Sequence, residues 1–290
     1  MTNPLRALIV FLVFTAACKS EPVKTIECPY YWSVEKDGKT THLLGTIHGG
    51  VDAKQLPQHV WADLDRAPAV AIEADISDPS LMAKIQRTGP SLREELGDAY
   101  WKKLEKVVGA PTAKALTSLK TSMAAAVIMH QQMPRQVQTP MDLEVLTTAK
   151  RKNKRVVFLE SIDDQLELLD KYITVRDVRN MLDDSGLLRS EMAAMVTAYE
   201  AGDEAALSST IAKSRAQALT QGYTQAEVDE QYAALFDRRN QAWIMPLEQL
   251  HAAGGGFVAV GSGHLIGPES VTALLAKKGY TVQRTACAKR

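Results

Sequence analysis

Apolar residues follow two different spacings along this chain, and each spacing predicts a different element. Runs of four to eight apolar and β-branched residues, alternating or continuous, predict strands. The first two runs flank an Asp-Gly pair at residues 37–38, which is typical of a tight β-hairpin. Strands are expected at residues 30–36, 40–47, 69–75, 155–160, 257–260 and 281–285.

Apolar positions that recur every three or four residues fill the middle of the chain and predict helices. No Pro-, Gly- or Ser-rich linker separates these helices from the strands. We therefore expect one α+β domain over residues 24–290, in which residues 77–253 form a mainly helical insertion. The helices are expected at residues 91–109, 111–130, 141–152, 161–172 and 224–253.

Both ends of this domain repeat one local pattern, which is a strand, a GxxH motif, a helix and a second strand. The first motif, GTIH, ends at His48, and the second, GSGH, ends at His264. Two such units can pair in one mixed β-sheet, which would bring both histidines to the same strand-end edge. Open α/β sheets bind their ligands at such an edge.

The N-terminus resembles an export signal. An apolar run at residues 7–14 is followed by Thr-Ala-Ala before Cys18, which predicts a signal peptide over residues 1–17. Small residues before a cysteine resemble a lipobox, so Cys18 is expected to be lipidated and to anchor the protein to the bacterial outer membrane, facing the periplasm. A soluble periplasmic or secreted protein is the alternative, because Thr15 stands where a lipobox prefers leucine.

Two further cysteines, Cys28 and Cys287, lie near the two ends of the mature chain. In an oxidising compartment they can form a disulfide that joins the termini, and two unrelated thiols are the alternative. No Cys-x-x-Cys pair is present, which excludes a cysteine-based zinc site.

The composition excludes several classes of protein. The chain has 34 Lys and Arg against 34 Asp and Glu, and 46% of its 290 residues are hydrophobic. Such a chain is an ordinary globular protein without the net positive charge that attracts nucleic acid, so no nucleic-acid partner is expected. A chain of this length can fold without a metal, so a bound metal would serve function.

His48 and His264 are candidate metal ligands or catalytic bases, because a glycine-containing turn after a strand presents the imidazole beyond the sheet edge. A structural turn histidine is the alternative for each motif alone. Glu73, in the strand expected at residues 69–75, is the third candidate. It lies either on the solvent face of an edge strand beside Asp75, or buried beside a cation that the two histidines and a metal would supply.

Arg239 and Asn240 lie within the helical pattern at residues 224–253. Asparagine is a poor helix-interior residue, so its place beside an arginine indicates a polar constellation, and a solvated helix face is the alternative. Three further polar residues near element ends are interpreted as caps and solvated termini, with contacts behind the site as the alternative: Asp142, Glu160 and Gln165.

Four sequence blocks are YYWSVEKDGKTTHLLGTIHGG, AIEAD, RRNQAW and GFVAVGSGHLIGPESVTALLAKKGYTVQR, with MDLEVLTTAK and VVFLESIDDQ in the helical middle. Together they resemble the TraB/GumN (TraB/PrgY/GumN) family, which is related to the Tiki metalloproteases. The resemblance implies an active centre of His48, Glu73 and His264, supported by Arg239 and Asn240. It also implies a divalent-metal-dependent peptidase that prefers manganese or cobalt, with erythromycin esterases and haem-binding proteins as more distant relatives.

The leading hypothesis is therefore a metallohydrolase that cleaves a peptide or protein substrate with metal-activated water. His48 and His264, with Glu73, would hold one divalent cation, and Glu73 is either a ligand or the general base. Arg239 would stabilise the oxyanion or hold a substrate carboxylate, with Asn240 orienting it. Such nitrogen and oxygen ligands also suit zinc, so manganese or cobalt rests on the resemblance alone.

Two alternatives stay open at this point. The first is a metal-free, esterase-like hydrolase in which one histidine acts as general base, as the erythromycin-esterase relatives suggest. The second is a non-catalytic protein that binds a peptide or haem. Insensitivity to a chelator would favour the first, and binding without cleavage would favour the second.

Overall fold

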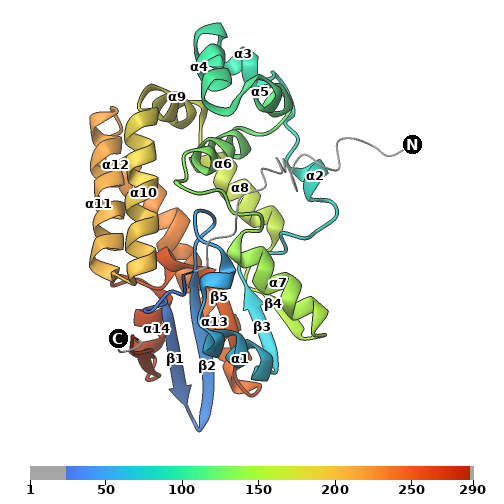
Figure 1. Cartoon of the computed structure of the whole chain (residues 1–290), viewed down its shortest axis with the longest axis vertical. Helices are drawn as coiled ribbons and strands as arrows, with labels where there is room; N and C mark the ends of the chain where they lie inside the picture. Colours follow the sequence, from blue (N-terminus) through green and yellow to red (C-terminus); the bar gives the residue numbers. More distant parts are fainter. Residues whose placement is uncertain (1–23, 288–290) are drawn as a thin grey trace.

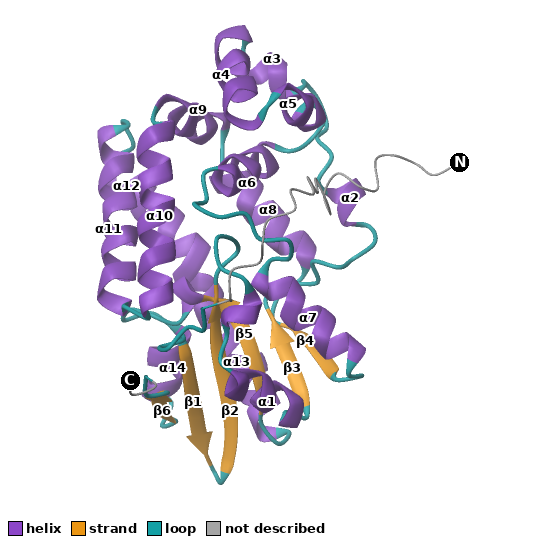
Figure 2. Cartoon of the chain, viewed as in Figure 1, coloured by secondary structure: helices purple, strands orange, loops and turns teal. Residues whose placement is uncertain are grey.

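A six-stranded mixed sheet forms the base of the molecule in the computed structural model, which describes residues 24–287. The strand order is β4-β3-β5-β2-β1-β6, with β2, β5, β3 and β4 parallel and β1 antiparallel to both of its neighbours (Figure 2). The expected α+β fold is confirmed. The strands are β1 Tyr31–Lys36, β2 Lys39–Thr46, β3 Ala69–Ile72, β4 Arg155–Phe158, β5 Gly256–Gly261 and β6 Thr281–Arg284.

Helices flank the sheet and extend beyond its upper edge. Helices α1 and α7 pack against the parallel strands, α13 packs against β2, and α14 packs against β6. Figure 1 shows the remaining helices above the carboxyl-terminal ends of β3 and β5, so the helical part of the chain covers that edge. The α-helices are α1 Gln58–Arg66, α2 Leu81–Lys84, α3 Leu92–Leu96, α4 Asp98–Val108, α5 Ala110–Leu116, α6 Thr121–Gln131, α7 Met141–Arg151, α8 Ile162–Tyr172, α9 Val175–Asp183, α10 Ser185–Ala201, α11 Glu204–Thr220, α12 Gln225–Tyr232, α13 Arg238–Ala252 and α14 Val271–Lys277.

Two of the expected long helices are interrupted in the structure. The helix expected at residues 91–109 is divided at Gly97, whose φ of 76° leaves the helical region and separates α3 from α4. The helix expected at residues 111–130 is divided between Leu116 and Thr121 into α5 and α6. Apolar periodicity continues across both breaks, which is why the pattern alone suggested single helices.

The helix expected at residues 224–253 is continuous but contains an irregular turn. Between α12 and α13 the residues Ala233–Asp237 form a π-helix, which carries an extra residue within the helical path. Such turns occur often at functional sites because they redirect side chains, and this one lies directly before Arg239.

Two strands, β3 and β4, end before the expected residues. Strand β3 ends at Ile72 rather than at residue 75, and β4 ends at Phe158 rather than at residue 160. Glu73 and Glu160 therefore follow their strands instead of lying within them. Since β3 is a central strand, the alternative that placed Glu73 on the solvent face of an edge strand is wrong.

The buried side chains form two separate clusters. One surrounds the sheet and includes Tyr30, Trp243 and Phe257, while the other lies within the helical part and includes Trp101 and Ile128. Helices α3–α6, α8 and α9 therefore share an apolar core apart from that of the sheet, whereas α10 and α11 contribute Tyr199 and Leu207 to the sheet cluster. Polar side chains can occupy the space between the two cores.

A disulfide between Cys28 and Cys287 joins the start and the end of the described chain. In residues 24–287 no helix combines the length and the apolar character that crossing a membrane requires. The expected signal peptide over residues 1–17 and the expected lipidation at Cys18 lie outside the described residues.

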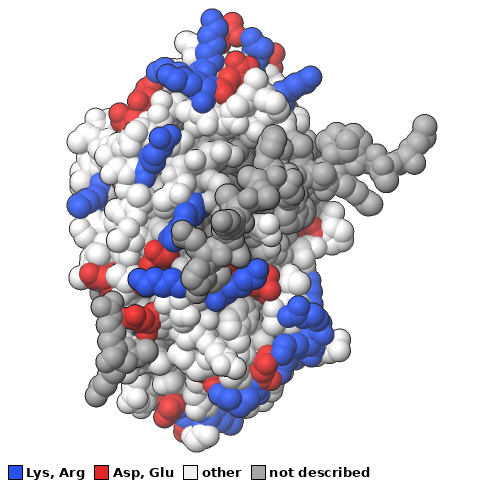
Figure 3. Space-filling view, viewed as in Figure 1, with Lys and Arg blue, Asp and Glu red and all other residues white. Residues whose placement is uncertain are grey.

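Basic side chains gather where α7 ends and β4 begins, as Figure 3 shows at the lower right. Lys150 and Lys152 pair with Asp75 and Asp65, respectively, across N···O distances of 3.5 and 2.6 Å. The cluster is therefore partly neutralised. It lies at the amino-terminal end of β4, opposite the edge to which both GxxH motifs lead.

Candidate functional site

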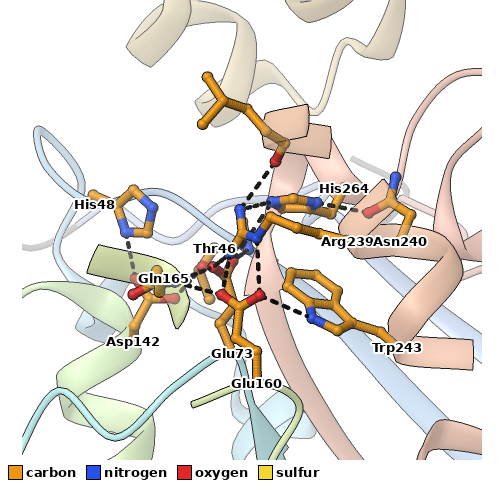
Figure 4. Close-up of polar contacts among 12 residues, drawn as sticks. Thr46, His48, Glu73, Asp142, Glu160, Gln165, Arg239, Asn240, Trp243 and His264 are labelled. Carbon is orange, nitrogen blue, oxygen red and sulfur yellow. Dashed lines mark hydrogen bonds and ion pairs between the residues drawn. The ribbon is translucent and has the colours of Figure 1, made fainter. Parts of the chain in front are cut away.

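The two GxxH motifs meet because their strands are parallel neighbours. Thr46 at the end of β2 is in register with Gly261 at the end of β5, so both motifs continue from the same edge of the sheet. Strand β3 lies on the other side of β5 and brings Glu73 to that edge. The structure thus places His48, Glu73 and His264 around one point (Figure 4).

Gly261 keeps the space between these three side chains open. A Cβ atom at this position would lie 3.4 Å from Glu73 Oε1, 3.5 Å from His264 Cδ2 and 3.9 Å from His48 Nε2. Gly45 has a different role, since its Cβ would lie 2.9 Å from Tyr30 Cβ. The glycines of the motifs therefore serve close packing at one position and an open centre at the other.

His48 is oriented by Asp142, a carboxylate that the sequence alone predicts to be a helix cap. Its Nδ1 lies 2.8 Å from Asp142 Oδ2, and the Thr46 hydroxyl donates a hydrogen bond to Asp142 Oδ1. Asp142 is buried, whereas the His48 side chain is 72% exposed. Because a carboxylate only accepts, His48 Nδ1 carries the proton and Nε2 is left to face the site.

The charge of Asp142 is the main influence on the protonation of His48. It raises the pKa of His48 above its ordinary value, and the charge of Glu73 adds in the same direction. The neutral form of His48, which can accept a proton, therefore predominates only at pH values above the ordinary pKa of histidine.

His264 is held in one tautomer. Its Nδ1 lies 2.6 Å from Asn240 Oδ1, and Asn240 Nδ2 donates to the Glu269 carbonyl, which fixes the orientation of the amide. Its Nε2 lies 3.1 Å from Arg239 Nη1. Since arginine only donates, the proton of the neutral ring lies on Nδ1. Asn240 thus orients His264, and not a substrate group held by Arg239.

Aromatic rings enclose the His264 imidazole. Trp243 lies 4.6 Å from it and Phe236 lies 5.0 Å from it, measured between ring centroids. Burial lowers the pKa of His264 to about 4, so the ring is neutral near pH 7. Phe236 comes from the π-helix, and a Cβ on Gly263 would lie only 2.9 Å from its ring.

The Glu73 carboxylate is 12% exposed, accepts three hydrogen bonds and has one longer contact. Oε1 accepts from the Gly261 N–H at 2.7 Å, and Oε2 accepts from Arg239 Nη2 at 2.7 Å and from Gln165 Nε2 at 3.2 Å. His264 contributes the long contact, with Nε2 3.9 Å from Oε1. The cation that a buried Glu73 needs is therefore Arg239.

These contacts keep Glu73 ionised. Burial by itself raises the pKa of Glu73. The opposing effects of His264, Arg239, His48 and the Gly261 N–H are larger together and lower the pKa to about 2. Near pH 7, where the pKa of about 4 leaves His264 neutral, the permanent charge of Arg239 stays beside the Glu73 carboxylate. A carboxylate with such a pKa is a weak general base.

Arg239 uses all five of its N–H groups within the protein. Nε and Nη2 donate to the two oxygens of Glu160 at 3.0 and 2.6 Å, and Nη2 also donates to Glu73. Nη1 donates to the Leu235 carbonyl at 3.0 Å and to His264. With all five N–H groups paired, the expected role of Arg239, binding an oxyanion or a substrate carboxylate, would require it to give up one of these contacts.

The interpretation of Asp142, Glu160 and Gln165 as helix caps and solvated termini was wrong. Asp142 contacts His48, Glu160 contacts Arg239, and Gln165 donates to both Glu73 and Glu160. One signal in the sequence could have identified two of them. Glu160 follows a strand that runs parallel to β3, and Gln165 lies in the first turn of the next helix, so both emerge at the edge that carries Glu73.

The donor types of the expected metal site are present, but their arrangement does not fit a metal. Two imidazole nitrogens and a carboxylate suit manganese, cobalt or zinc, and Gly261 leaves space between them. However, both His264 Nε2 and Glu73 bind Arg239. Across residues 24–287 no group of three or more His, Cys, Asp or Glu side chains is placed to hold a metal ion.

Comparisons with known proteins agree over most of the chain. The model of the TraB/PrgY/gumN family matches residues 30–284. The uncharacterized protein YbaP of Shigella flexneri is 24% identical over 247 residues, which cover 81% of this chain and 87% of the relative. YbaP of Escherichia coli strain K12 is 24% identical over 246 residues with the same coverage. No solved structure gives a significant match.

Proposed function

Because this chain belongs to the TraB/PrgY/gumN family and its two GxxH motifs meet at one sheet edge, we propose that it is a hydrolase that cleaves a peptide bond. One observation carries the proposal. Within residues 24–287, His48 Nε2 has no hydrogen-bond partner and borders the site, while a buried carboxylate, Asp142, holds Nδ1. This is the arrangement in which a histidine accepts a proton through one nitrogen and is oriented through the other.

In this proposal His48 is the general base. Its neutral form takes a proton from the attacking water through Nε2, and the same proton then passes to the leaving amine. Asp142 and Glu73 stabilise the imidazolium that forms between these steps, since both carboxylates raise the pKa of His48. Exposure of the His48 side chain leaves it accessible to a peptide or protein substrate.

The little-exposed side chains beside His48 form a hydrogen-bonded polar cluster. Glu73, His264 and Arg239 are each 13% exposed or less at the side chain, and each is hydrogen-bonded to another group of the site. Such groups do not reorganise during a reaction, which is the property that makes electrostatic stabilisation effective. Glu73 then acts through its charge and not as a base.

A divalent-metal-dependent form of the same hydrolase is the second candidate. It is favoured by the space beside Gly261, which all three expected ligands border. Manganese or cobalt would be the metal by family resemblance, and the donor set also suits zinc. In the structure Arg239 Nη1 contacts His264 Nε2. A metal could bind this nitrogen only if Arg239 moved away.

The test compares the chain from residue 19 onward with His48→Ala and with His59→Ala, an exposed histidine outside the site. Hydrolysis of a fluorogenic peptide library and of a p-nitrophenyl ester is measured with chelator and with added manganese, cobalt or zinc. We expect His48→Ala to lose activity on the order of 10²- to 10⁴-fold and His59→Ala to retain it, with no effect of chelator.

Other outcomes distinguish the alternatives. Activity that chelator removes and manganese or cobalt restores would favour the metal-dependent candidate. Cleavage of the ester alone would point to an esterase-like hydrolase. Absence of cleavage, with peptide binding or a haem absorption band after hemin addition, would overturn the hydrolase and leave a non-catalytic binding protein.

We also propose that the protein is exported and lipid-anchored through Cys18 to the outer membrane, facing the periplasm. The signal-like residues 1–17 support this location, and a soluble periplasmic or secreted protein is the alternative. Expression of the chain with and without Cys18→Ser, followed by membrane fractionation, tests it. Sedimentation of the native chain with outer membranes and release of the variant are expected, whereas equal release of both would indicate a soluble protein.

A further inference from the structure

We propose that Arg239, held in position by Glu160, is the fixed cation of this site and stands where the family resemblance places a metal. Glu160 is then a positioning residue, because its carboxylate acts on His264 and on the Glu73 carboxylate through Arg239, with Gln165 as a second link to Glu73. The proposal rests on contacts and not on hydrolysis, so it holds or fails independently of the proposed activity.

Glu160 fixes the guanidinium in its plane. Its two oxygens accept from Arg239 Nε and Nη2, which is a bidentate pair in which the arginine cannot rotate without losing a bond. Glu160 is itself held by Gln165 Nε2 at 2.9 Å and by Trp243 Nε1 at 3.3 Å. The Glu160 side chain is 13% exposed, so water contributes little to holding it.

The two terminal nitrogens of the same guanidinium also contact the residues at the sheet edge. Nη2 binds Glu73 and Nη1 binds His264 Nε2, at 2.7 and 3.1 Å. Because a guanidinium is planar and rigid, the orientation that Glu160 imposes decides whether both contacts can form at once. A cation–π contact with Trp243, with the guanidinium carbon 4.8 Å from the ring centroid, adds to this restraint.

The position of Arg239 has two consequences for His264. The ring must present an acceptor at Nε2, so its proton is confined to Nδ1, where Asn240 receives it. The same contact also occupies the nitrogen that a metal would need. Arg239 therefore supplies permanently the positive charge between Glu73 and His264 that a divalent ion would supply on binding.

A matched control lies one residue away. Arg238 binds both oxygens of Glu230 through Nη1 and Nη2, but these side chains are 50% and 54% exposed and do not touch the site. Glu160→Gln and Glu230→Gln therefore remove the same charge from the same kind of arginine pair. Only the first is expected to affect the site.

The test is ¹⁵N NMR of the imidazole rings at pH 7.5, with the His264 signals assigned from their loss in His264→Gln. The native chain is expected to show a protonated Nδ1 and an unprotonated Nε2 for His264. In Glu160→Gln a mixture of both tautomers is expected, and in Glu230→Gln the native pattern. An unchanged His264 pattern in Glu160→Gln would overturn the role of Glu160.

A second variant keeps the test decisive if Glu160→Gln does not fold, which near-ultraviolet circular dichroism checks. Arg239→Lys retains the charge but offers three donors on a flexible stem in place of the planar fork. It is expected to lose the single tautomer of His264. A native pattern in this variant would show that the fork geometry is not what orients the ring.

Metal titration tests the remaining part of the proposal. Manganese, cobalt and zinc are titrated by calorimetry into the native chain, Arg239→Ala and His48→Ala/His264→Ala. We expect the native chain to bind the metals no more tightly than His48→Ala/His264→Ala does. Arg239→Ala is expected to bind them at least tenfold more tightly than the native chain, because His264 Nε2 is released. Broadening of the native His264 signals by substoichiometric manganese would overturn the proposal and establish a metal centre.

Discussion

Single residues in this site have roles that follow from their hydrogen-bond partners. His48 and His264 have the same place in their motifs, yet Asp142 raises the pKa of one and burial lowers that of the other. Two titratable groups whose environments move their pKa values apart are suited to different tasks. The exposed His48 is suited to proton transfer, while the buried His264 is suited to neutral hydrogen bonding with Arg239.

The first prediction concerns the carboxylate behind His48. Replacing Asp142 with Asn removes the main cause of the raised pKa, so the acid limb of the pH profile of kcat/KM should move to lower pH. The maximal rate should fall on the order of 10²- to 10⁴-fold, because the amide no longer enforces the productive tautomer. Peptide hydrolysis measured from pH 5 to pH 10 tests both effects.

The control for this prediction is Asp63→Asn. Asp63 also lies beside a histidine, with 3.7 Å between Asp63 Oδ1 and His42 Nε2, but the pair lies away from the site. Its pH profile should match that of the native chain when rates are expressed per folded molecule. An acid limb that stays in place in Asp142→Asn would exclude His48 as the group whose ionisation controls the rate.

At the scale of elements, the strands position the site and the irregular helical turns complete it. Parallel pairing of β2 with β5, and of β3 with β5, delivers His48, His264 and Glu73 to one edge. The π-helix before α13 supplies Phe236 and the Leu235 carbonyl that accepts from Arg239. Strand patterns of period two were predictable, whereas an extra residue in a helical turn leaves no mark in apolar periodicity.

The second prediction concerns the break between α3 and α4. Gly97 has a φ of 76°, and a Cβ at this position would meet nothing within 4 Å. Gly97→Ala should therefore lower the free energy of unfolding by about 1 to 2 kcal/mol through backbone strain alone. Urea denaturation followed by circular dichroism measures the change.

Gly186→Ala is the matched control, because a Cβ at Gly186 also meets nothing and its φ is not positive. Gly186 lies in the first turn of α10, so alanine should stabilise the protein by roughly 0.5 to 1 kcal/mol. Equal effects in both variants would mean that the conformation of Gly97 does not cause the helix break.

At the scale of the whole molecule, helices α3–α6, α8 and α9 have a core separate from that of the sheet, and the polar site lies where the two meet. Glu73 follows a sheet strand, Gln165 belongs to α8, and Asp142 belongs to α7. The disulfide between Cys28 and Cys287 then joins the first and last described segments beside the sheet.

The third prediction concerns this disulfide. Cross-linking residues separated by 259 positions restricts the unfolded chain, which in the chain-entropy model stabilises the native state by up to about 5 kcal/mol. Reduction should lower the urea midpoint without abolishing the site. Cys28→Ala/Cys287→Ala should have the lower midpoint and no response to reductant. A midpoint that reductant leaves unchanged in the native chain would show that the bond does not contribute.

The sequence by itself determined the parts of this protein that depend on local patterns. Apolar runs and the Asp-Gly turn were sufficient for the strands, and the repeated GxxH motif was sufficient to place His48 and His264 at one edge. These features are local because successive side chains of a strand point to opposite faces of the sheet, and the conformation of a glycine turn depends only on neighbouring residues.

Only the tertiary structure decided the partners of these residues. Asp142 lies 94 positions from His48, and Arg239 lies 166 positions from Glu73, yet each pair is within 2.8 Å. A polar residue at a helix end has the same sequence pattern whether water or a buried side chain satisfies it. The choice of Arg239 as the cation beside Glu73 therefore appears only when the folded chain brings both groups into one water-poor space.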